Sequence, residues 1–324
     1  MKRFIKNIIL FFVVLTVLWI GSITFLVFSN MHFIIPNVNS TTGGYGYSLE
    51  RFRDAELEKD VDVLIFGSSH AYRGFDPRVL EENGKNVFNF GSSAQTPINS
   101  YYLLEQYGAS MKPKVVVMDV FWDGLASPPA EAVESSIDIC SNKELNKLDL
   151  EMMIGQHNVL LTNTFMFHAI RNKLKPIANA VQENIENDQY ISGGYVERTF
   201  EGSIEKDLIG MKPEKKEYNS QQLDYILKMK QYCDENQIRF VLTRVPITAE
   251  VIVATPNTKE LKEQMVDFCS SNSIEFIDYC NLSEFEAIGL DSYHDFYDPT
   301  HMCKTGVEKF NRYLLTNDEL GLFK

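Results

Sequence analysis

The chain has 324 residues, of which 44% are hydrophobic, and its formal net charge is −13. This acidic balance argues against nucleic acid or an anionic membrane surface as the main partner, because both are negatively charged. A negative net charge also keeps a domain soluble, and this alone is enough to account for it. The sequence shows no internal period, so a repeat architecture is also excluded.

An uncharged and almost wholly apolar segment runs from Ile8 to Phe28. At about 1.5 Å per residue it is long enough to cross a hydrocarbon core of roughly 30 Å. The residues before it are basic, and the next basic residue is Arg51. The positive-inside rule therefore predicts a single-pass anchor in the cell membrane over residues 1–30, with a cytoplasmic N-terminus and the rest outside. A cleaved signal peptide is the alternative, although its apolar region is usually only about 7–15 residues long.

Residues 31–60 are predicted to be a linker that spaces the following domain from the bilayer. The stretch 37–46 is rich in Asn, Ser, Thr and Gly, which is typical of flexible coil. A short charged helix is expected at 49–58. The remainder, 61–324, is long enough to bury a substantial core as one domain.

Five short apolar stretches are predicted to be strands, at 61–66, 87–90, 114–121, 238–245 and 274–279. Helical patterns lie between and after them, at 76–82, 98–107, 220–236, 258–271 and 304–315. Strands that alternate with amphipathic helices indicate parallel βαβ units. We therefore expect an α/β fold with a doubly wound, flavodoxin-like parallel sheet, whose ligand site lies at the carboxyl ends of the strands.

A long insert, residues 123–219, separates the third predicted strand from the fourth. It contains a plausible helix at 148–156, an apolar patch at 159–170 and a turn at 192–194. Because it begins beside the carboxyl edge of the sheet, it could be a lid or a partner-docking element. A purely structural appendage is an equal alternative.

Two short motifs carry the residue types of an activated hydroxyl nucleophile. Gly67-Ser68-Ser69-His70 follows the first predicted strand and would present a hydroxyl at its end. Near the C-terminus, Asp298-Pro299-Thr300-His301 places a carboxylate three residues before an imidazole. A histidine base takes the proton of the hydroxyl, and the carboxylate orients the base and stabilises its charge.

These motifs resemble those of the SGNH/GDSL hydrolases. The segment 67–70 is similar to block I of that family, Gly91 in the segment 89–93 to block II, and Asp298-x-x-His301 to block V. The chain is most similar to the membrane-anchored members that serve cell-envelope acylation, such as the proteins of teichoic-acid D-alanylation and alginate O-acetylation. The resemblance implies the SGNH-type fold over most of the region from residue 62 to the C-terminus.

The resemblance also implies roles for individual residues. Ser69 is the nucleophile, with Ser68 as the alternative, His301 is the general base and Asp298 orients it. The backbone N–H groups of Ser69 and Gly91 are the expected donors of an oxyanion hole, because the bare backbone of glycine allows a close approach to the reacting carbonyl.

The chain departs from the family at block III, where an asparagine normally follows the third strand as an oxyanion donor. The segment 117–123 offers Asp119 and Asp123 instead, and carboxylates would repel an oxyanion. Either a backbone N–H near Trp122 or a residue of the insert replaces this donor, or two donors suffice. Loss of one donor commonly costs about 3–4 kcal/mol of transition-state stabilisation.

Other polar residues near the expected site have two readings each. His294 with Asp295 is a second histidine–aspartate pair, which we expect at the surface. His70 either shapes the turn or contacts substrate, or it is an ordinary structural histidine. Arg73 and Arg244 are candidates for holding a carboxylate or phosphate of the substrate, although solvated arginines are commoner.

The five cysteines are Cys140, Cys233, Cys269, Cys280 and Cys303. An odd number leaves at least one free thiol, and none of the cysteines has metal-ligand spacing. Cys269 and Cys280 flank the last predicted strand, so a disulfide between them and two buried thiols both remain open.

The resemblance implies acyl-ester chemistry on a cell-envelope glycopolymer through an acyl-serine, without a metal or an organic cofactor. Acyl transfer to or from a sugar hydroxyl is the favoured reaction, and a carbohydrate or lipid esterase is the second. A third reading is a catalytically silent module that docks onto a membrane-embedded acyltransferase. The expected partners are therefore an acylated envelope polysaccharide and such an acyltransferase, and not nucleic acid.

Overall fold

A five-stranded parallel sheet forms the centre of the protein. The computed structural model describes residues 1–29, 46–127, 159–174, 187–212 and 214–323. The strand order is β2-β1-β3-β6-β7, and every neighbouring pair is parallel. The strands are β1 (Val63–Phe66), β2 (Val87–Asn89), β3 (Val115–Asp119), β6 (Arg239–Arg244) and β7 (Glu275–Asp278). The predicted α/β fold with a parallel sheet is confirmed, and each predicted strand contains an observed one.

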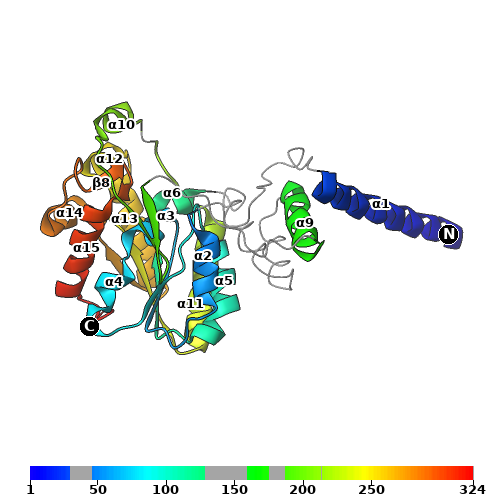
Figure 1. Cartoon of the computed structure of the whole chain (residues 1–324), viewed down its shortest axis with the longest axis horizontal. Coiled ribbons are helices and arrows are strands. Elements are labelled where there is room, and N and C mark those ends of the chain that lie inside the picture. Colours follow the sequence, from blue (N-terminus) through cyan, green and yellow to red (C-terminus); the bar gives the residue numbers. More distant parts are fainter. Residues whose placement is uncertain (30–45, 128–158, 175–186, 213, 324) are drawn as a thin grey trace.

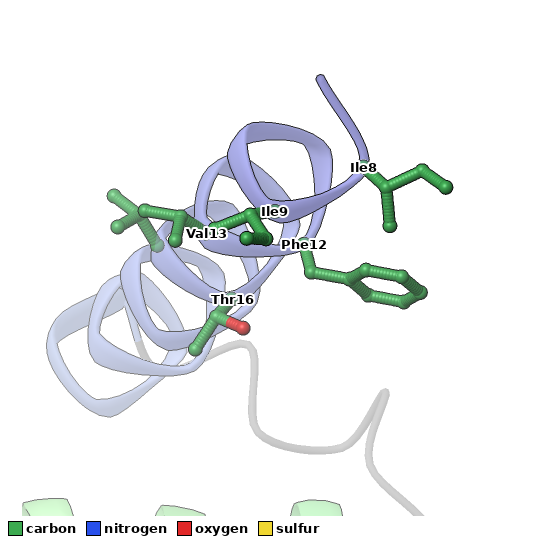
Figure 2. A pocket seen from close by; sticks show the side chains of 6 residues that line it. Ile8, Ile9, Phe12, Val13 and Thr16 are labelled. Atoms are coloured by element: carbon green, nitrogen blue, oxygen red, sulfur yellow. The ribbon is translucent and has the colours of Figure 1, made fainter. Parts of the chain in front are cut away.

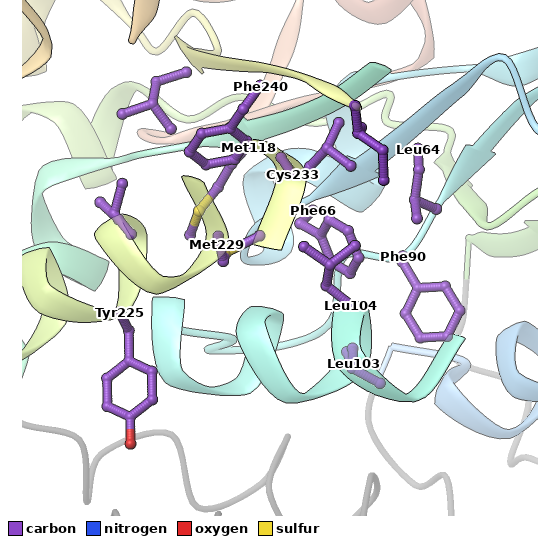
Figure 3. Packing of buried hydrophobic residues seen from close by; sticks show 14 of the residues in the cluster. Leu64, Phe66, Phe90, Leu103, Leu104, Met118, Tyr225, Met229, Cys233 and Phe240 are labelled. Atoms are coloured by element: carbon purple, nitrogen blue, oxygen red, sulfur yellow. The ribbon is translucent and has the colours of Figure 1, made fainter. Parts of the chain in front are cut away.

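The first strand is apolar throughout because both faces of the sheet are covered. All four residues of β1 are buried. Leu64 and Phe66 point to one face and Val63 and Ile65 to the other, as the period of two requires. Figure 3 shows the first face, where side chains of the strands meet those of α5 and α11.

Helices cover both faces of the sheet (Figure 1). The first face packs against α2 (Ser48–Ala55), α5 (Pro97–Met111), α11 (Ser220–Glu235) and α13 (Thr258–Ser271). The second face packs against α4 (Pro77–Leu80), α14 (Leu282–Ile288) and α15 (Lys304–Thr316). A 3-10 turn, η2 (Glu81–Asn83), extends α4. All the helices that the sequence predicts in the described part of residues 61–324 are present.

Several short elements were not predicted from the sequence. They are α3 (Ser69–Gly74), α6 (Trp122–Ala126), β4 (Asp188–Ile191), β5 (Tyr195–Arg198), α10 (Glu205–Gly210), α12 (Ala249–Ala254), β8 (Phe296–Asp298) and β9 (His301–Met302). Most of them surround the carboxyl edge of the sheet. Short elements of this kind lack the extended periodicity on which sequence prediction depends.

Part of the insert is an antiparallel hairpin of β4 and β5, with its turn at residues 192–194 as predicted. The turn lies against the edge strand β2, because Asn89 N–H donates to Gly193 O at 2.8 Å. A side chain at position 194 would meet Asn89 O at 1.9 Å, so only glycine fits there. The hairpin thereby covers part of an exposed sheet edge. The helix predicted at 148–156 lies outside the described residues.

The apolar N-terminal segment is one helix, α1 (Lys2–Ser29), which is long and apolar enough to span a membrane. Only 6% of its most apolar window is buried. Figure 2 shows a shallow groove along it, lined by Ile8, Ile9, Phe12, Val13, Thr16 and Val17. Near its C-terminal end α1 packs against α9 (Val159–Leu174), the apolar patch of the insert, and Trp19 Nε1 donates to Asn163 Oδ1 at 2.7 Å.

Candidate active site

The strand order places the expected residues at one point of the sheet. The chain leaves β1 toward β2 on one side, and returns to continue with β3 on the other. In open α/β sheets the crevice at such a reversal, outside the carboxyl ends of the strands, is the usual ligand site. The segments 67–70 and 120–123 both begin there, directly after β1 and β3.

The sequence after β1 makes a tight turn into a short helix. Gly67 has a φ of +147°, and a side chain there would approach Asp119 Cβ and Ala71 Cβ at 2.9 Å. Ser68 is the N-cap of α3, and its hydroxyl accepts from His70 N–H at 3.4 Å. Ser69 is the first residue of the helix, where a backbone N–H has no partner within the helix.

Ser69, His301 and Asp298 form a continuous chain of hydrogen bonds. Ser69 Oγ lies 2.7 Å from His301 Nε2, although the two residues are 232 positions apart. On the other side of the ring, His301 Nδ1 lies 2.8 Å from Asp298 Oδ2. The carboxylate can only accept, so Nδ1 carries the proton and Nε2 is free to accept from the serine hydroxyl. The alternative nucleophile Ser68 caps α3 and is not in this chain.

The carboxylate of Asp298 is held by the backbone of its own turn. Its Oδ1 accepts from Thr300 N–H at 2.8 Å and from His301 N–H at 2.9 Å. Burial alone would raise the pKa of Asp298, but the hydrogen bond and charge of His301, with these two amides, lower the pKa to about 2. Asp298 is therefore ionised at neutral pH and has a fixed orientation.

His70 packs beneath the site as a neutral ring. It is 4% exposed, and its ring centroid lies 3.9 Å from that of Phe121 and 4.8 Å from that of His301. Burial, and then the repulsion of His301, lower its pKa well below 6.5. Its Nδ1 has no hydrogen-bond partner among the described residues. This packing between Phe121 and His301 fits the reading of an ordinary structural histidine.

Gly91 is in the expected place but its N–H is already engaged. The amide donates to Asn89 Oδ1 at 3.1 Å, and Asn89 Nδ2 in turn donates to Ala71 O at 2.8 Å. A side chain on Gly91 would meet Tyr72 N and Ala71 Cβ at 3.0 Å, so glycine permits close packing on α3. The expectation that Gly91 offers a free oxyanion donor is therefore not met, because a buried acceptor already satisfies its amide.

The two aspartates at block III differ in their surroundings. Asp119 is buried behind Gly67, and its Oδ1 accepts from Val245 N–H at 2.9 Å. Burial raises its pKa to about 7. Asp123 lies on α6 in an ion pair of 3.0 Å with Lys216. Neither carboxylate is an oxyanion donor, as expected.

The two arginines expected to hold substrate are instead paired inside the protein. Arg73 donates to both oxygens of Asp188, at 3.1 and 2.8 Å. Arg244 is fully buried, donates to the hydroxyl of Tyr218 and lies 3.7 Å from Asp278. The sequence could not identify these partners, because the acidic residues are distant in the chain. Both assignments as anion ligands are therefore corrected.

The second histidine–aspartate pair is also corrected. His294 Nδ1 lies 3.0 Å from Asp291 Oδ1, and not against Asp295. Asp295 accepts from Lys309 Nζ at 2.6 Å instead. The spacing Asp291-x-x-His294 is the same as in Asp298-x-x-His301, so the sequence does contain a signal for this pairing. The expected place at the surface is correct, since the side chain of His294 is 83% exposed.

The cysteines in the described part of the chain are free thiols. They are buried at positions 233, 269, 280 and 303. No disulfide joins Cys269 to Cys280, so of the two open readings the buried thiols are observed. Burial raises the pKa of Cys269 to about 12, which keeps this thiol protonated and unreactive. Cys140 lies outside the described residues.

The fold and site together define an α/β protein with a serine–histidine–aspartate constellation at the carboxyl edge of a parallel sheet. Neither a protein-family model nor a curated protein matches the sequence. Among solved structures, the chain is similar to a protein described as an acylhydrolase from Bacteroides fragilis, with 13% identity and a TM-score of 0.42 over 84% of this chain and 95% of that one.

Two further solved structures are similar. One is a GDSL-like lipase from Bacteroides thetaiotaomicron, with 12% identity and a TM-score of 0.41 over 84% of this chain and 98% of that one. The other is described as a lipolytic protein of the G-D-S-L family from Desulfitobacterium hafniense, with 14% identity and a TM-score of 0.39 over 78% of this chain and 97% of that one.

Proposed function

We propose that the protein is a membrane-anchored, extracytoplasmic serine acyltransferase that acts on O-acyl esters of a cell-envelope glycopolymer. The observation that carries the acyl-ester chemistry is the chain of contacts from Ser69 Oγ through His301 to Asp298. The polymer and the transfer reaction come from the sequence resemblance. The place outside the membrane comes from the basic residues that precede α1.

The reaction begins with attack of Ser69 Oγ on the ester carbonyl, while His301 Nε2 takes the hydroxyl proton. The imidazolium is stabilised by Asp298, and the N–H of Ser69 donates to the developing oxyanion. His301 then gives the proton to the leaving alcohol, and an acyl-serine remains. In the second half His301 takes the proton of a sugar hydroxyl while its oxygen attacks the acyl-serine. His301 then returns this proton to Ser69 Oγ as the bond between the acyl group and Ser69 breaks, and the acylated sugar leaves.

One specific observation favours slow turnover of simple esters. The N–H of Gly91 is engaged with Asn89, so of the two expected donors only that of Ser69, at the start of α3, is left without a partner by its own helix. The lack of one oxyanion donor commonly lowers kcat by about 10²–10³-fold. A sugar acceptor or a partner that completes the site would raise the rate, which fits transfer better than hydrolysis. The same observation supports the second candidate, a silent docking module for a membrane acyltransferase.

The nucleophile is tested with a serine-reactive fluorophosphonate on the full-length protein in detergent. We expect labelling of Ser69, its loss in Ser69→Ala and its collapse in His301→Ala, because an unactivated serine is a poor nucleophile. Ser68→Ala is the matched control and should retain labelling. If the wild type is not labelled although its reactivity toward Cys and Lys probes shows that it is folded, the protein is the silent docking module and not an enzyme.

Transfer is separated from hydrolysis by the fate of the acyl group. A positioned acceptor competes with water through an effective molarity of about 10⁵ M or more. With p-nitrophenyl acetate as donor, a transferase should release p-nitrophenol slowly. This release should become faster when an envelope oligosaccharide is added, and acetylated sugar should be the product. Rapid release that no glycan changes, together with removal of esters from acylated polymer, would establish an esterase instead.

The proposed orientation is tested by protease treatment of intact cells, or of spheroplasts where an outer membrane intervenes. We expect the domain to be degraded while α1 stays in the membrane fraction. A protected domain would reverse the orientation. A soluble mature chain would show that the apolar segment is a cleaved signal peptide.

A further inference from the structure

The insert hairpin, β4 and β5, contributes a buried carboxylate beside the active site. The side chain of Asp188 has no exposed surface. It accepts from both terminal nitrogens of Arg73, at 3.1 and 2.8 Å, and from Arg198 Nη1 at 3.0 Å. Arg73 lies on α3, the helix that begins at Ser69, and Arg198 is the residue opposite Asp188 in the hairpin. One carboxylate thus joins the insert to the helix of the nucleophile.

Both guanidinium groups contact the same aromatic ring. The Cζ of Arg198 lies 4.5 Å from the ring centroid of Tyr297, and that of Arg73 lies 5.2 Å from it. At these distances a cation is attracted by the π-face of the ring. Because Asp188 determines where both cations lie, it also determines how they hold Tyr297.

Tyr297 in turn contacts the imidazole of His301. The two rings are stacked, with centroids 5.6 Å apart and an angle of 14° between their planes. Tyr297 also directly precedes Asp298 in β8, the carboxylate that binds the other edge of the imidazole. The plane of His301 therefore depends on Tyr297 as well as on Asp298.

We propose that Asp188 is a positioning residue of this site, which acts through Arg73, Arg198 and Tyr297 to hold the His301 imidazole in line with Ser69. The proposal rests on the proposed serine chemistry and assigns the insert a part in it. None of the four network residues receives or donates the reacting proton. They limit the motion of the ring that does, and a displacement of about 1 Å in such a group can cost about 10²-fold in rate.

The test compares two carboxylates of the same hairpin. Glu197 is also buried, with 6% of its side chain exposed, and it pairs with Arg78 and Lys304 rather than with the Tyr297 network. Asp188→Asn should lower kcat for p-nitrophenyl acetate about ten- to 100-fold and change KM less than about twofold. Glu197→Gln should leave kcat within about twofold while removing a buried carboxylate charge of the same hairpin, whose partners Arg78 and Lys304 are about half exposed.

A pair of variants at Tyr297 separates ring stacking from general stability. Tyr297→Phe keeps the ring and should retain kcat within about threefold, whereas Tyr297→Leu removes the stacking surface and should match Asp188→Asn. Circular dichroism and thermal melting show that each variant is folded at the assay temperature. Equal losses of kcat in Asp188→Asn and Glu197→Gln, or an unchanged kcat in Tyr297→Leu, would overturn the proposal.

A second measurement does not depend on turnover. The ¹⁵N signals of the His301 imidazole, assigned by their loss in His301→Ala, should shift or broaden in Asp188→Asn and Tyr297→Leu and stay in place in Glu197→Gln. If the wild type neither turns over nor is labelled, the proposed function fails, but these signals still decide whether Asp188 positions the ring. Unchanged signals in Asp188→Asn would contradict the network.

Discussion

Two Asp-x-x-His segments lie close together in this chain and differ in what surrounds them. In both, the histidine Nδ1 contacts the aspartate three residues earlier, at 3.0 Å for His294 and 2.8 Å for His301. The His294 side chain is 83% exposed, whereas that of His301 is 18% exposed and meets Ser69 through Nε2. The local pairing is therefore a property of the motif, and the link to a nucleophile is a property of its place in the fold.

The backbone explains why the two rings have different surroundings. The carbonyl of His294 accepts from Thr305 Oγ1 at 2.9 Å, at the start of α15, and its ring extends into solvent. His301 lies in β9, which contacts α3 and so brings the imidazole to the turn after β1. The same spacing thus yields a surface pair in one case and a partly buried base in the other.

The largest expected effect separates the two histidines. His301→Ala should lower kcat for p-nitrophenyl acetate by about 10³-fold or more, because Ser69 loses its base. His294→Ala should leave kcat within about twofold, since its ring contacts solvent and Asp291. Steady-state kinetics of the two purified variants measure this difference, and similar losses in both would contradict the assignment of His301.

The next effect separates the two aspartates. Asp298→Asn preserves the shape of the side chain but no longer fixes the tautomer of the ring, so kcat should fall by about 10²–10⁴-fold. Asp291→Asn should not change kcat by more than about twofold. Fluorophosphonate labelling rates give an independent measurement, and an Asp298→Asn variant that labels at the wild-type rate would show that the carboxylate has no part in activation.

A third carboxylate, Asp119, shows that the partner and not burial alone decides the pKa. Its folded pKa is raised from 3.8 to about 7, whereas that of Asp298 is lowered to about 2. Between about pH 4 and 7 the folded protein holds a proton on Asp119 that the unfolded chain releases, so stability should fall as the pH rises through this window. The contribution is up to about 4 kcal/mol at about 1.4 kcal/mol per pKa unit.

Urea unfolding of the full-length protein at several pH values measures this effect. In Asp119→Asn the decrease between about pH 4 and 7 should become smaller than in the wild type, because the titrating group is gone. Asp123→Asn is the control, since it replaces an acidic residue of the same segment that is half exposed. An unchanged pH dependence in Asp119→Asn would contradict the raised pKa.

The smallest effect concerns stability rather than activity. The lowered pKa of Asp298 stabilises the folded state above about pH 4, and this contribution is lost as the pH falls toward about 2. Asp298→Asn should therefore cost about 1–2 kcal/mol at pH 7, allowing for partial exposure, and Asp291→Asn less than about 0.5 kcal/mol. The difference between the urea midpoints of the two variants should become smaller as the pH is lowered. Equal midpoints at pH 7 would contradict a stabilising role of the Asp298 charge.

Much of the fold could be predicted because its signals are local. Short apolar strands and amphipathic helices alternate along the chain, and the parallel sheet follows from that alternation. The turn at Gly67 also follows locally, since a glycine and two serines come directly after an apolar strand. The clearance at Gly67 is different, because Asp119 of the distant strand β3 sets part of it. The long apolar helix at the N-terminus is a matter of composition and length alone.

Several features of the site depend on groups that are distant in the chain. The sequence contains two Asp-x-x-His segments, and only the packing of β9 against α3 shows which imidazole reaches Ser69. The N–H of Gly91 is satisfied by the side chain of Asn89, which is only two residues away but is itself held by the carbonyl of Ala71 on α3.

The arginines illustrate the same limit. From the sequence, Arg73 is a candidate for binding an anionic group of the substrate. Its observed partner, Asp188, is 115 positions away in a hairpin that the sequence did not predict. Arg244 likewise lies with Asp278 beneath the surface. Periodicity and turn chemistry report on neighbours in the chain, so the sequence by itself determined the strands of the central sheet, the longer helices, the apolar N-terminal helix and the types of the candidate catalytic residues. The tertiary structure decided which polar groups pair, because burial and long-range contact exist only after the chain has folded.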